Sequence, residues 1–197
     1  MPDRPHVCVF CGSSPGSDPA FLEAARRVGA TLAREGLGLV YGGGRVGLMG
    51  AVADAALAVG GRVVGIIPEP LATREVAHAG LTELVIVPGM HERKNLMARR
   101  SAGFLTLPGG IGTFEEFFEI LTWAALGLHA KPMGLLDVGG YFGPLRALLE
   151  HAVAAGFVRP SHLAVLRISA DPEALTAGLL VGASTTEGRG WIGPDQT

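Results

Sequence analysis

The sequence predicts an α/β fold in which a mostly parallel, doubly wound sheet carries helices on both faces. Short apolar runs alternate with longer segments of helical periodicity along most of the chain, and this alternation is typical of parallel strands joined by helical crossovers. Some runs are apolar at nearly every position, as in the segment 63–67 (VVGII). Such strands are expected when helices cover both faces of the sheet.

Seven apolar runs are expected to form the strands. The fifth contains the sequence GFLTL directly before a glycine loop. Branched and aromatic residues dominate most of the runs, as is usual for strands. The expected strands span 6–10, 37–41, 62–67, 84–87, 101–107, 131–137 and 165–168.

The segments between these runs have helical spacing and recognisable ends. Asp18 followed by Pro19 is a good pair for an N-cap and first helical residue, and Gly36 ends the first helix. The apolar residues of that helix recur at helical spacing: Phe21, Leu22, Ala25, Val28 and Leu32. The expected helices span 19–35, 48–59, 91–102, 113–126 and 141–155, with a last one from 171.

Two stretches have weaker patterns. Between 68 and 81 we expect a loop with some helix. Residues 183–197 consist largely of Gly, Ser, Thr and charged residues, so we expect a flexible tail there. The sequence therefore predicts a single Rossmann-like nucleotide-binding domain over 1–182.

Composition restricts the class of function. A chain of 197 residues with 48% hydrophobic and 17% charged residues suits one globular domain. A net charge of −2 provides no basic face for nucleic acid or for an acidic membrane. No apolar run approaches the roughly 18 residues needed to span a bilayer, and residues 1–5 lack the pattern of a secretory signal. We therefore expect a soluble cytoplasmic protein without nucleic-acid or membrane partners.

Cys8 and Cys11 form a Cys-x-x-Cys pair whose simplest interpretation is structural. Cys8 lies inside an apolar run, and residues three apart on a strand point to opposite faces. No second Cys or His pair lies nearby to complete a zinc site. We expect buried thiols and no metal.

Three loops rich in glycine or serine follow predicted strands, at 11–17, 42–47 and 109–112. The carboxyl ends of parallel strands meet at one edge of a sheet, where ligands bind near the switch in strand order. The loops should therefore gather at one edge and form a nucleotide site.

The third loop has the chemistry of a phosphate cradle. Its glycines lead from a strand into a helix whose first N–H groups have no partner and carry about half a positive charge. Glycine lets the backbone approach an oxyanion closely. Arg93 and Lys94 lie upstream, and Glu115 and Glu116 lie downstream. Phosphate cradle, cation and carboxylate together predict an active site.

Other interpretations of these residues remain open. Thr113 and Glu116 also have the spacing of a capping box, and Arg93 with Lys94 could be a solvated helix face. The spacing Gly42-x-Gly44-x-x-Gly47, with Glu69 near the end of the next strand, fits a dinucleotide fingerprint. An NAD(P)-dependent oxidoreductase and a non-catalytic nucleotide carrier are therefore alternatives.

The motif pair resembles the signature of a known family. Met90-x-x-Arg93-Lys94 followed by Pro108-Gly109-Gly110-x-Gly112-Thr113-x-x-Glu116 is similar to that of the LOG family, cytokinin riboside 5′-monophosphate phosphoribohydrolases long mislabelled as lysine decarboxylases. Tyr41-Gly42-Gly43-Gly44-x-x-Gly47-Leu48-Met49-Gly50 also resembles that family's second glycine motif. The resemblance runs from about Val7 to Tyr141.

The resemblance implies hydrolysis of the N-glycosidic bond of an adenosine 5′-monophosphate, with or without an N6 substituent, to free base and ribose 5-phosphate. It implies Arg93 and Glu116 as the catalytic pair, no cofactor and a homodimer. AMP, isopentenyl-AMP and trans-zeatin ribotide are all compatible with it. The substrate-binding residues that it implies are Ser13, Ser14, Gly43, Gly44, Glu75, Lys94, Gly109, Gly110, Ile111, Gly112, Thr113 and Thr122.

The chemistry of the reaction fits these residue types. A carboxylate such as Glu116 can stabilise an oxocarbenium ion and activate water, and a guanidinium such as Arg93 can offset charge on the departing base. A lysine decarboxylase would need a Schiff-base lysine with partners for pyridoxal phosphate, and no such pattern surrounds the chain's lysines. The helix face around Phe117, Leu121 and Trp123 is expected to form the dimer surface.

Overall fold

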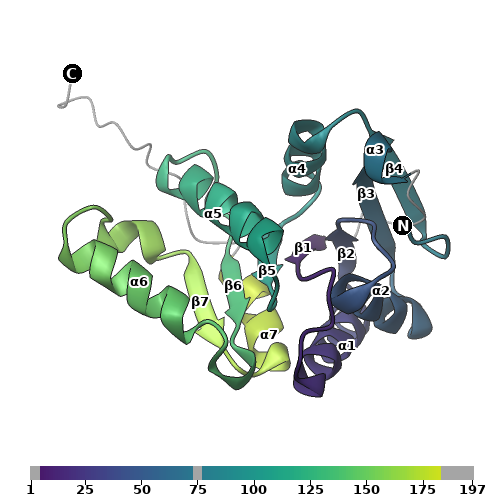
Figure 1. Cartoon of the computed structure of the whole chain (residues 1–197), viewed down its shortest axis with the longest axis horizontal. Helices are drawn as coiled ribbons and strands as arrows, with labels where there is room; N and C mark the ends of the chain where they lie inside the picture. The colour runs from purple at the N-terminus through teal and green to yellow at the C-terminus, as the bar shows by residue number, and fades with distance from the viewer. Residues whose placement is uncertain (1–4, 73–76, 183–197) are drawn as a thin grey trace.

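Seven parallel strands form one sheet in the order β4-β3-β2-β1-β5-β6-β7 (Figure 1). The computed structural model describes residues 5–72 and 77–182. The strands are β1 (His6–Phe10), β2 (Gly38–Tyr41), β3 (Val63–Pro68), β4 (Glu83–Val87), β5 (Gly103–Thr106), β6 (Met133–Leu136) and β7 (Leu166–Ser169). The predicted parallel sheet is confirmed, and each strand overlaps the range expected from its sequence.

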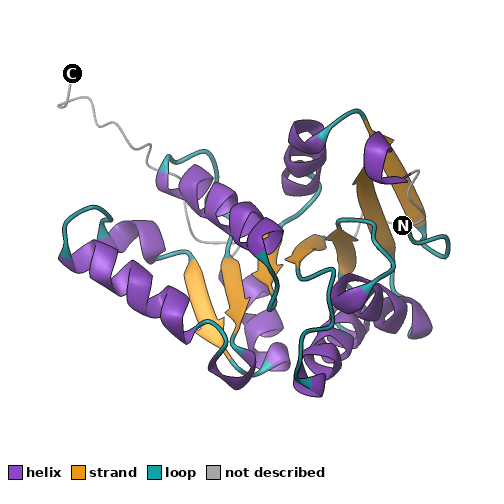
Figure 2. Cartoon of the chain, viewed as in Figure 1, coloured by secondary structure: helices purple, strands orange, loops and turns teal. Residues whose placement is uncertain are grey.

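Helices cover both faces of the sheet, as expected (Figure 2). The helices are α1 (Pro19–Arg34), α2 (Gly47–Ala58), α3 (Glu69–Leu71), α4 (Met90–Arg99), α5 (Ile111–Ala125), α6 (Gly143–Ala154) and α7 (Pro172–Gly182), with short 3-10 turns η2 (Val138–Gly140) and η3 (Pro160–Leu163). One apolar core packs under α1, α2 and α7, and the other under α4, α5 and α6. The domain is therefore a three-layer sandwich.

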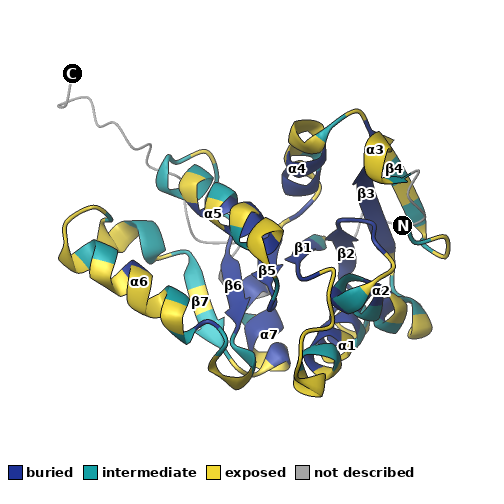
Figure 3. Ribbon diagram, in the orientation of Figure 1, coloured by how far each residue is buried: buried dark blue, intermediate teal, exposed yellow. Residues whose placement is uncertain are grey.

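The central strand β1 contributes to both cores because successive side chains alternate across a strand. Val7 and Val9 pack into the core under α1, whereas Cys8 and Phe10 pack into the other. Figure 3 shows the buried strands between the two helical layers. Cys11, which follows the strand, belongs to the same core as Val9, so the two cysteines lie on opposite faces as predicted, both buried with free thiols.

The strand order reverses at β1, and this reversal locates the site. From β1 the chain adds β2, β3 and β4 on one side, and then returns to place β5 on the other side of β1. The loops after β1 and β5 therefore depart in opposite directions, which opens a crevice at the carboxyl edge of the sheet.

Several boundaries follow from local chemistry. Asp18 caps α1, and its carboxylate accepts a hydrogen bond from Ala20 N at 2.8 Å. In the described part of the weakly patterned stretch after β3, α3 forms a single turn, and Ala77 forms an isolated bridge with Gly44. The predicted tail, 183–197, lies outside the described residues. Across the described ranges, no helix is both long and apolar enough to cross a membrane.

Candidate active site

Three loops meet at the carboxyl edge of the sheet, as the sequence predicts. Gly12 N, in the loop after β1, donates a hydrogen bond to Pro108 O in the loop after β5 at 3.1 Å. Gly12 O in turn accepts from Leu48 N at the start of α2 at 3.0 Å. The loops after β1, β2 and β5 thus form one connected rim.

The helix after the third loop begins with free amide groups. Helix α5 starts at Ile111, and its N-cap is Gly110, which has no side chain to cap the helix. The capping-box interpretation is wrong, because Thr113 lies inside the first turn and Glu116 one turn further on, where its carboxylate contacts Arg93 instead. An uncapped N-terminus leaves N–H groups for an anionic ligand.

Arg93 and Glu116 form a buried ion pair between α4 and α5. Arg93 Nη2 lies 3.1 Å from Glu116 Oε1, and the two residues are only 9% and 8% exposed. Burial raises the pKa of Glu116 to about 7, although the Arg93 charge opposes the increase. The carboxyl group can therefore exchange a proton near neutral pH, as catalytic carboxyl groups do.

Gly42, at the end of β2, makes room for the guanidinium group. A Cβ atom at Gly42 would lie 2.2 Å from Arg93 Nη2, so any side chain would displace the arginine. Arg93 Nε is buried and has no hydrogen-bond partner in the described structure. Sequence reasoning missed Gly42 as a site residue, although it belongs to the recognised glycine motif.

A cavity of about 270 Å³ joins the ion pair to the start of α5. Its walls combine free helix amides, a carboxylate, a guanidinium and two thioethers. Gly110 and Gly112 leave it open, because a Cβ atom at either position would meet no atom within 4 Å. The lining residues are Cys11, Gly12, Ser13, Met49, Met90, Arg93, Gly110, Ile111, Gly112, Thr113, Glu115 and Glu116.

The cavity brings together seven of the predicted site residues: Ser13, Arg93, Gly110, Ile111, Gly112, Thr113 and Glu116. Sequence reasoning missed Met49 and Met90 as part of its walls, although both belong to the quoted motifs. The uncapped start of α5 and the ion pair of Arg93 and Glu116 are therefore walls of one cavity.

Comparisons with known proteins identify the family of the chain. Residues 49–179 match a family model described as "Possible lysine decarboxylase". A cytokinin riboside 5′-monophosphate phosphoribohydrolase of Rhodococcoides fascians is 49% identical over 179 residues, which cover 90% of each chain. The enzyme of that name from Arabidopsis thaliana is 48% identical over 154 residues, 78% of this chain and 71% of the plant protein. The chain belongs to the LOG family.

Solved structures with the same fold include proteins of other function. A molybdenum cofactor binding protein of Rippkaea orientalis has a TM-score of 0.69 at 22% identity, over 94% of this chain and 100% of that chain. The molybdenum cofactor carrier protein of Chlamydomonas reinhardtii has a TM-score of 0.70 at 21% identity, over 91% and 99%. At such identities the likeness shows only that the fold is shared.

Several contacts expected from the LOG resemblance do not line the cavity in this chain. Lys94 Nζ instead pairs with Glu115 at 2.5 Å and with Glu119 at 2.9 Å. Thr122 is exposed, and its hydroxyl group donates to Phe118 O at 2.7 Å within α5. Glu75 lies outside the described residues.

The glycines of the second loop serve packing rather than a dinucleotide. A Cβ atom at Gly43 would lie 3.3 Å from Ile67 Cβ, and one at Gly47 would lie 2.3 Å from the backbone of Ser13. Gly44 O accepts a hydrogen bond from Tyr41 Oη at 3.1 Å. Gly43 and Gly44 are therefore buried against the protein itself, which removes the support for a pyrophosphate site on them.

Two further cavities flank α5. One, of about 210 Å³, adjoins the candidate active site and contains Ser14 and Gly109 together with Phe21 and Tyr141. Tyr141 Oη donates to Gly109 O at 2.5 Å and so fixes the glycine loop. The expected contacts Ser14 and Gly109 thus lie beside the active-site cavity rather than in its wall.

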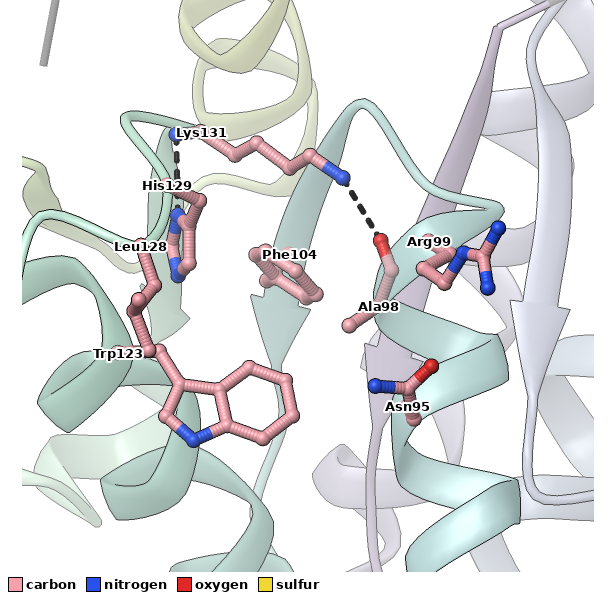
Figure 4. A pocket seen from close by; sticks show the side chains of 8 residues that line it. All are labelled: Asn95, Ala98, Arg99, Phe104, Trp123, Leu128, His129 and Lys131. Carbon is pink, nitrogen blue, oxygen red and sulfur yellow. Dashed lines mark hydrogen bonds between the residues drawn. The ribbon is translucent and has the colours of Figure 1, made fainter.

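The other cavity, of about 300 Å³, lies between the last turns of α4 and α5 (Figure 4). Trp123 and His129 line it, and Lys131 extends over Phe104 to donate to Ala98 O at 2.7 Å. It is separate from the cavity that contains Arg93 and Glu116.

The lysine residues of the chain do not fit the description of the family model as a lysine decarboxylase. The chain has two lysines, and neither Lys94 nor Lys131 lines the active-site cavity. Lys94 is held by carboxylates and Lys131 by a helix carbonyl. Within the described ranges, no group of three or more His, Cys, Asp or Glu residues could hold a metal.

Proposed function

We propose that the protein hydrolyses the N-glycosidic bond of a cytokinin riboside 5′-monophosphate and releases the free base and ribose 5-phosphate. The observation that carries this proposal is the buried pair of Arg93 and Glu116 in one cavity with the uncapped start of α5. The names of the relatives that cover 90% and 78% of this chain support the same substrate class.

In this proposal the 5′-phosphate binds the amide groups at the start of α5. Gly110 and Gly112 leave space for phosphate oxygens, and the helix N-terminus favours negative charge. A phosphate held there places the ribose beside Glu116, which lies one turn further along the same helix. Remote binding of this kind positions the reacting bond.

Glu116 and Arg93 then have separate roles. As the bond between C1′ and the purine nitrogen breaks, positive charge develops on the ribose and negative charge on the base. The ionised Glu116 stabilises the sugar cation and accepts a proton from the attacking water, whose oxygen bonds to C1′. Arg93 offsets the charge of the departing base, which takes up a proton from solvent, while Glu116 returns the proton of the attacking water to solvent.

We also propose a homodimer. The supporting observation is the exposure of large apolar side chains on and after α5: Ile111 is 84% exposed, Leu128 is 69% exposed and Phe118 is 37% exposed. The dimer surface expected around Phe117, Leu121 and Trp123 is wrong for the first two, which belong to the core under α5, and Trp123 is partly buried against that core. Light scattering should give twice the mass of the chain, and Leu128→Asp should shift the protein towards the monomer.

The decisive experiment incubates the protein with AMP and with isopentenyl-AMP and follows base and ribose 5-phosphate by chromatography. Release of base from either nucleotide, abolished in Glu116→Ala, supports the proposal and ranks the substrates. Glu150→Ala, which removes an exposed carboxylate on α6, is the matched control and should remain active. Tight nucleotide binding without turnover would support a carrier instead.

A further inference from the structure

Two adjacent layers of ion pairs join α4 to α5. Arg93 pairs with Glu116, and the next residue, Lys94, pairs with Glu115 and Glu119. Residues four apart lie on one face of a helix, whereas adjacent residues are turned by about 100°. The two consecutive cations on α4 therefore contact carboxylates on two neighbouring faces of α5. These contacts fix the rotation of each helix about its axis relative to the other.

The cation of the second layer is buried as deeply as Arg93 and Glu116, whereas the side chains of its partners Glu119 and Glu115 are 22% and 49% exposed. Lys94 is 9% exposed, and burial alone would lower its pKa, but the carboxylates of Glu115 and Glu119 reverse this and raise it. Glu119 Oε2 is buried and accepts no hydrogen bond in the described structure. Lys94 is therefore the cation that offsets this partly buried carboxylate, since a buried carboxylate oxygen without a cation is costly.

Lys94 is also one of the charged groups around Glu116. The groups that face Glu116 are Arg93 and Lys94 on α4, Glu115 and Glu119 on α5, and the thiols of Cys8 and Cys11. Both neighbouring carboxylates favour the protonated form of Glu116, and both cations favour the ionised form. Without Lys94, two unbalanced negative charges would remain beside the proposed catalytic carboxylate.

We infer that Lys94 and Glu119 are positioning residues whose ion pair fixes α4 against α5 and balances the charge beside the contact between Glu116 and Arg93. This inference rests on the proposed role of Glu116. It assigns to Lys94 a task different from a substrate contact, consistent with its absence from the lining of the cavity.

The inference predicts opposite effects for two substitutions in one network. Lys94→Met removes the cation that balances Glu115 and Glu119, so the titration midpoint of Glu116 should rise by roughly one pH unit. Glu119→Gln removes one of the carboxylates, so the midpoint should fall. Lys94→Arg keeps the charge and should leave the midpoint near that of the wild type.

The test measures Glu116 directly by NMR titration of ¹³C-labelled glutamate side chains without substrate, with the signal assigned through Glu116→Gln. Arg146→Met removes an exposed cation on α6 and is the matched control, with an unchanged midpoint. Opposite shifts in Lys94→Met and Glu119→Gln support the inference. Shifts in the same direction, or none in either variant, would overturn it.

Steady-state kinetics on the same variants separates positioning from binding. A positioning role predicts that Lys94→Met lowers kcat at least tenfold and changes KM less than threefold. It also predicts that activity is lost on the acidic side at a higher pH than in the wild type. A substrate contact predicts mainly an increase in KM, and that result would overturn the inference. Because the NMR titration needs no turnover, inactivity of the wild-type protein would contradict only the proposed function.

Discussion

Arg93 Nη2 and Glu116 Oε1 lie 3.1 Å apart between α4 and α5, in a contact from which water is almost excluded. Such an ion pair usually lowers the pKa of its carboxyl group, but here burial outweighs the attraction and raises the pKa to about 7. The pair is therefore poor as a stabilising contact and well suited to proton transfer, a combination that is common at catalytic sites.

Stability should depend on pH through Glu116. Its pKa is raised from 4.5 to about 7 in the folded protein, so the folded state binds the proton more tightly than the unfolded chain. The stabilisation is complete below pH about 4.5 and is lost as the pH rises through about 7. Between pH 4.5 and 8, wild type should lose up to about 3 kcal/mol relative to Glu116→Gln. Urea unfolding of both proteins across this range measures the difference, and a constant difference would contradict the prediction.

Activity should also depend on the ionisation of Glu116, but it should increase as the pH rises. If ionised Glu116 activates water, kcat/KM should fall below a midpoint near pH 7, because this parameter reports ionisation of the free enzyme. The measurement is the initial rate of base release at low substrate concentration between pH 5 and 9. A rate that falls as the pH rises through 7 would instead assign Glu116 a role as a general acid.

The fold was predictable because the apolar runs are unambiguous. The pattern of β1, with Val7 and Val9 on one face and Cys8 and Phe10 on the other, is apolar throughout and specifies a strand covered on both sides. Phe117 and Leu121 were harder to assign. They are apolar residues on an amphipathic helix, and periodicity cannot distinguish a core face from a subunit interface.

The residues of the candidate site were predictable where they belong to sequence motifs, and less so where their role depends on how the helices are oriented. Thr113 and Glu116 have the spacing of a capping box, but the helix starts two residues before Thr113, and helix ends are the least certain feature of any sequence-based prediction. Lys94 illustrates a different limit. Its neighbour Arg93 faces the cavity whereas Lys94 faces Glu119, a difference that depends on the rotation of α4 and not on local sequence.

Gly42→Ala should reduce activity without unfolding the protein. The new methyl group would lie 2.2 Å from Arg93 Nη2 and must displace the flexible guanidinium rather than the backbone. A shift of about 1 Å in a positioned group can reduce the rate about 100-fold. Gly143→Ala is the control, because a Cβ atom there meets no atom within 4 Å. Equal activity of both variants would show that the position of Arg93 is not critical.

Gly112→Ala should increase the stability of the protein and weaken its affinity for the substrate. Gly112 lies in the first turn of α5 and lines the cavity, and a Cβ atom would meet no protein atom within 4 Å. Alanine should stabilise the helix by up to about 1 kcal/mol, while its methyl group occupies the space of the proposed phosphate. We expect a higher melting temperature together with a roughly tenfold higher KM, equivalent to about 1.4 kcal/mol. An unchanged KM would place the phosphate elsewhere.

Cys11 should report occupancy of the cavity independently of turnover. Burial, followed by the charge of Glu116, raises the pKa of both thiols, so both should react slowly with iodoacetamide. Cys11 is 6% exposed and lines the cavity, whereas Cys8 is fully buried on the other face of β1. Saturating AMP should therefore slow the alkylation of Cys11 severalfold without affecting Cys8, as resolved by tandem mass spectrometry of the peptide that contains both. Equal protection of the two thiols would indicate general stabilisation of the fold, and no protection of Cys11 would place the nucleotide outside this cavity.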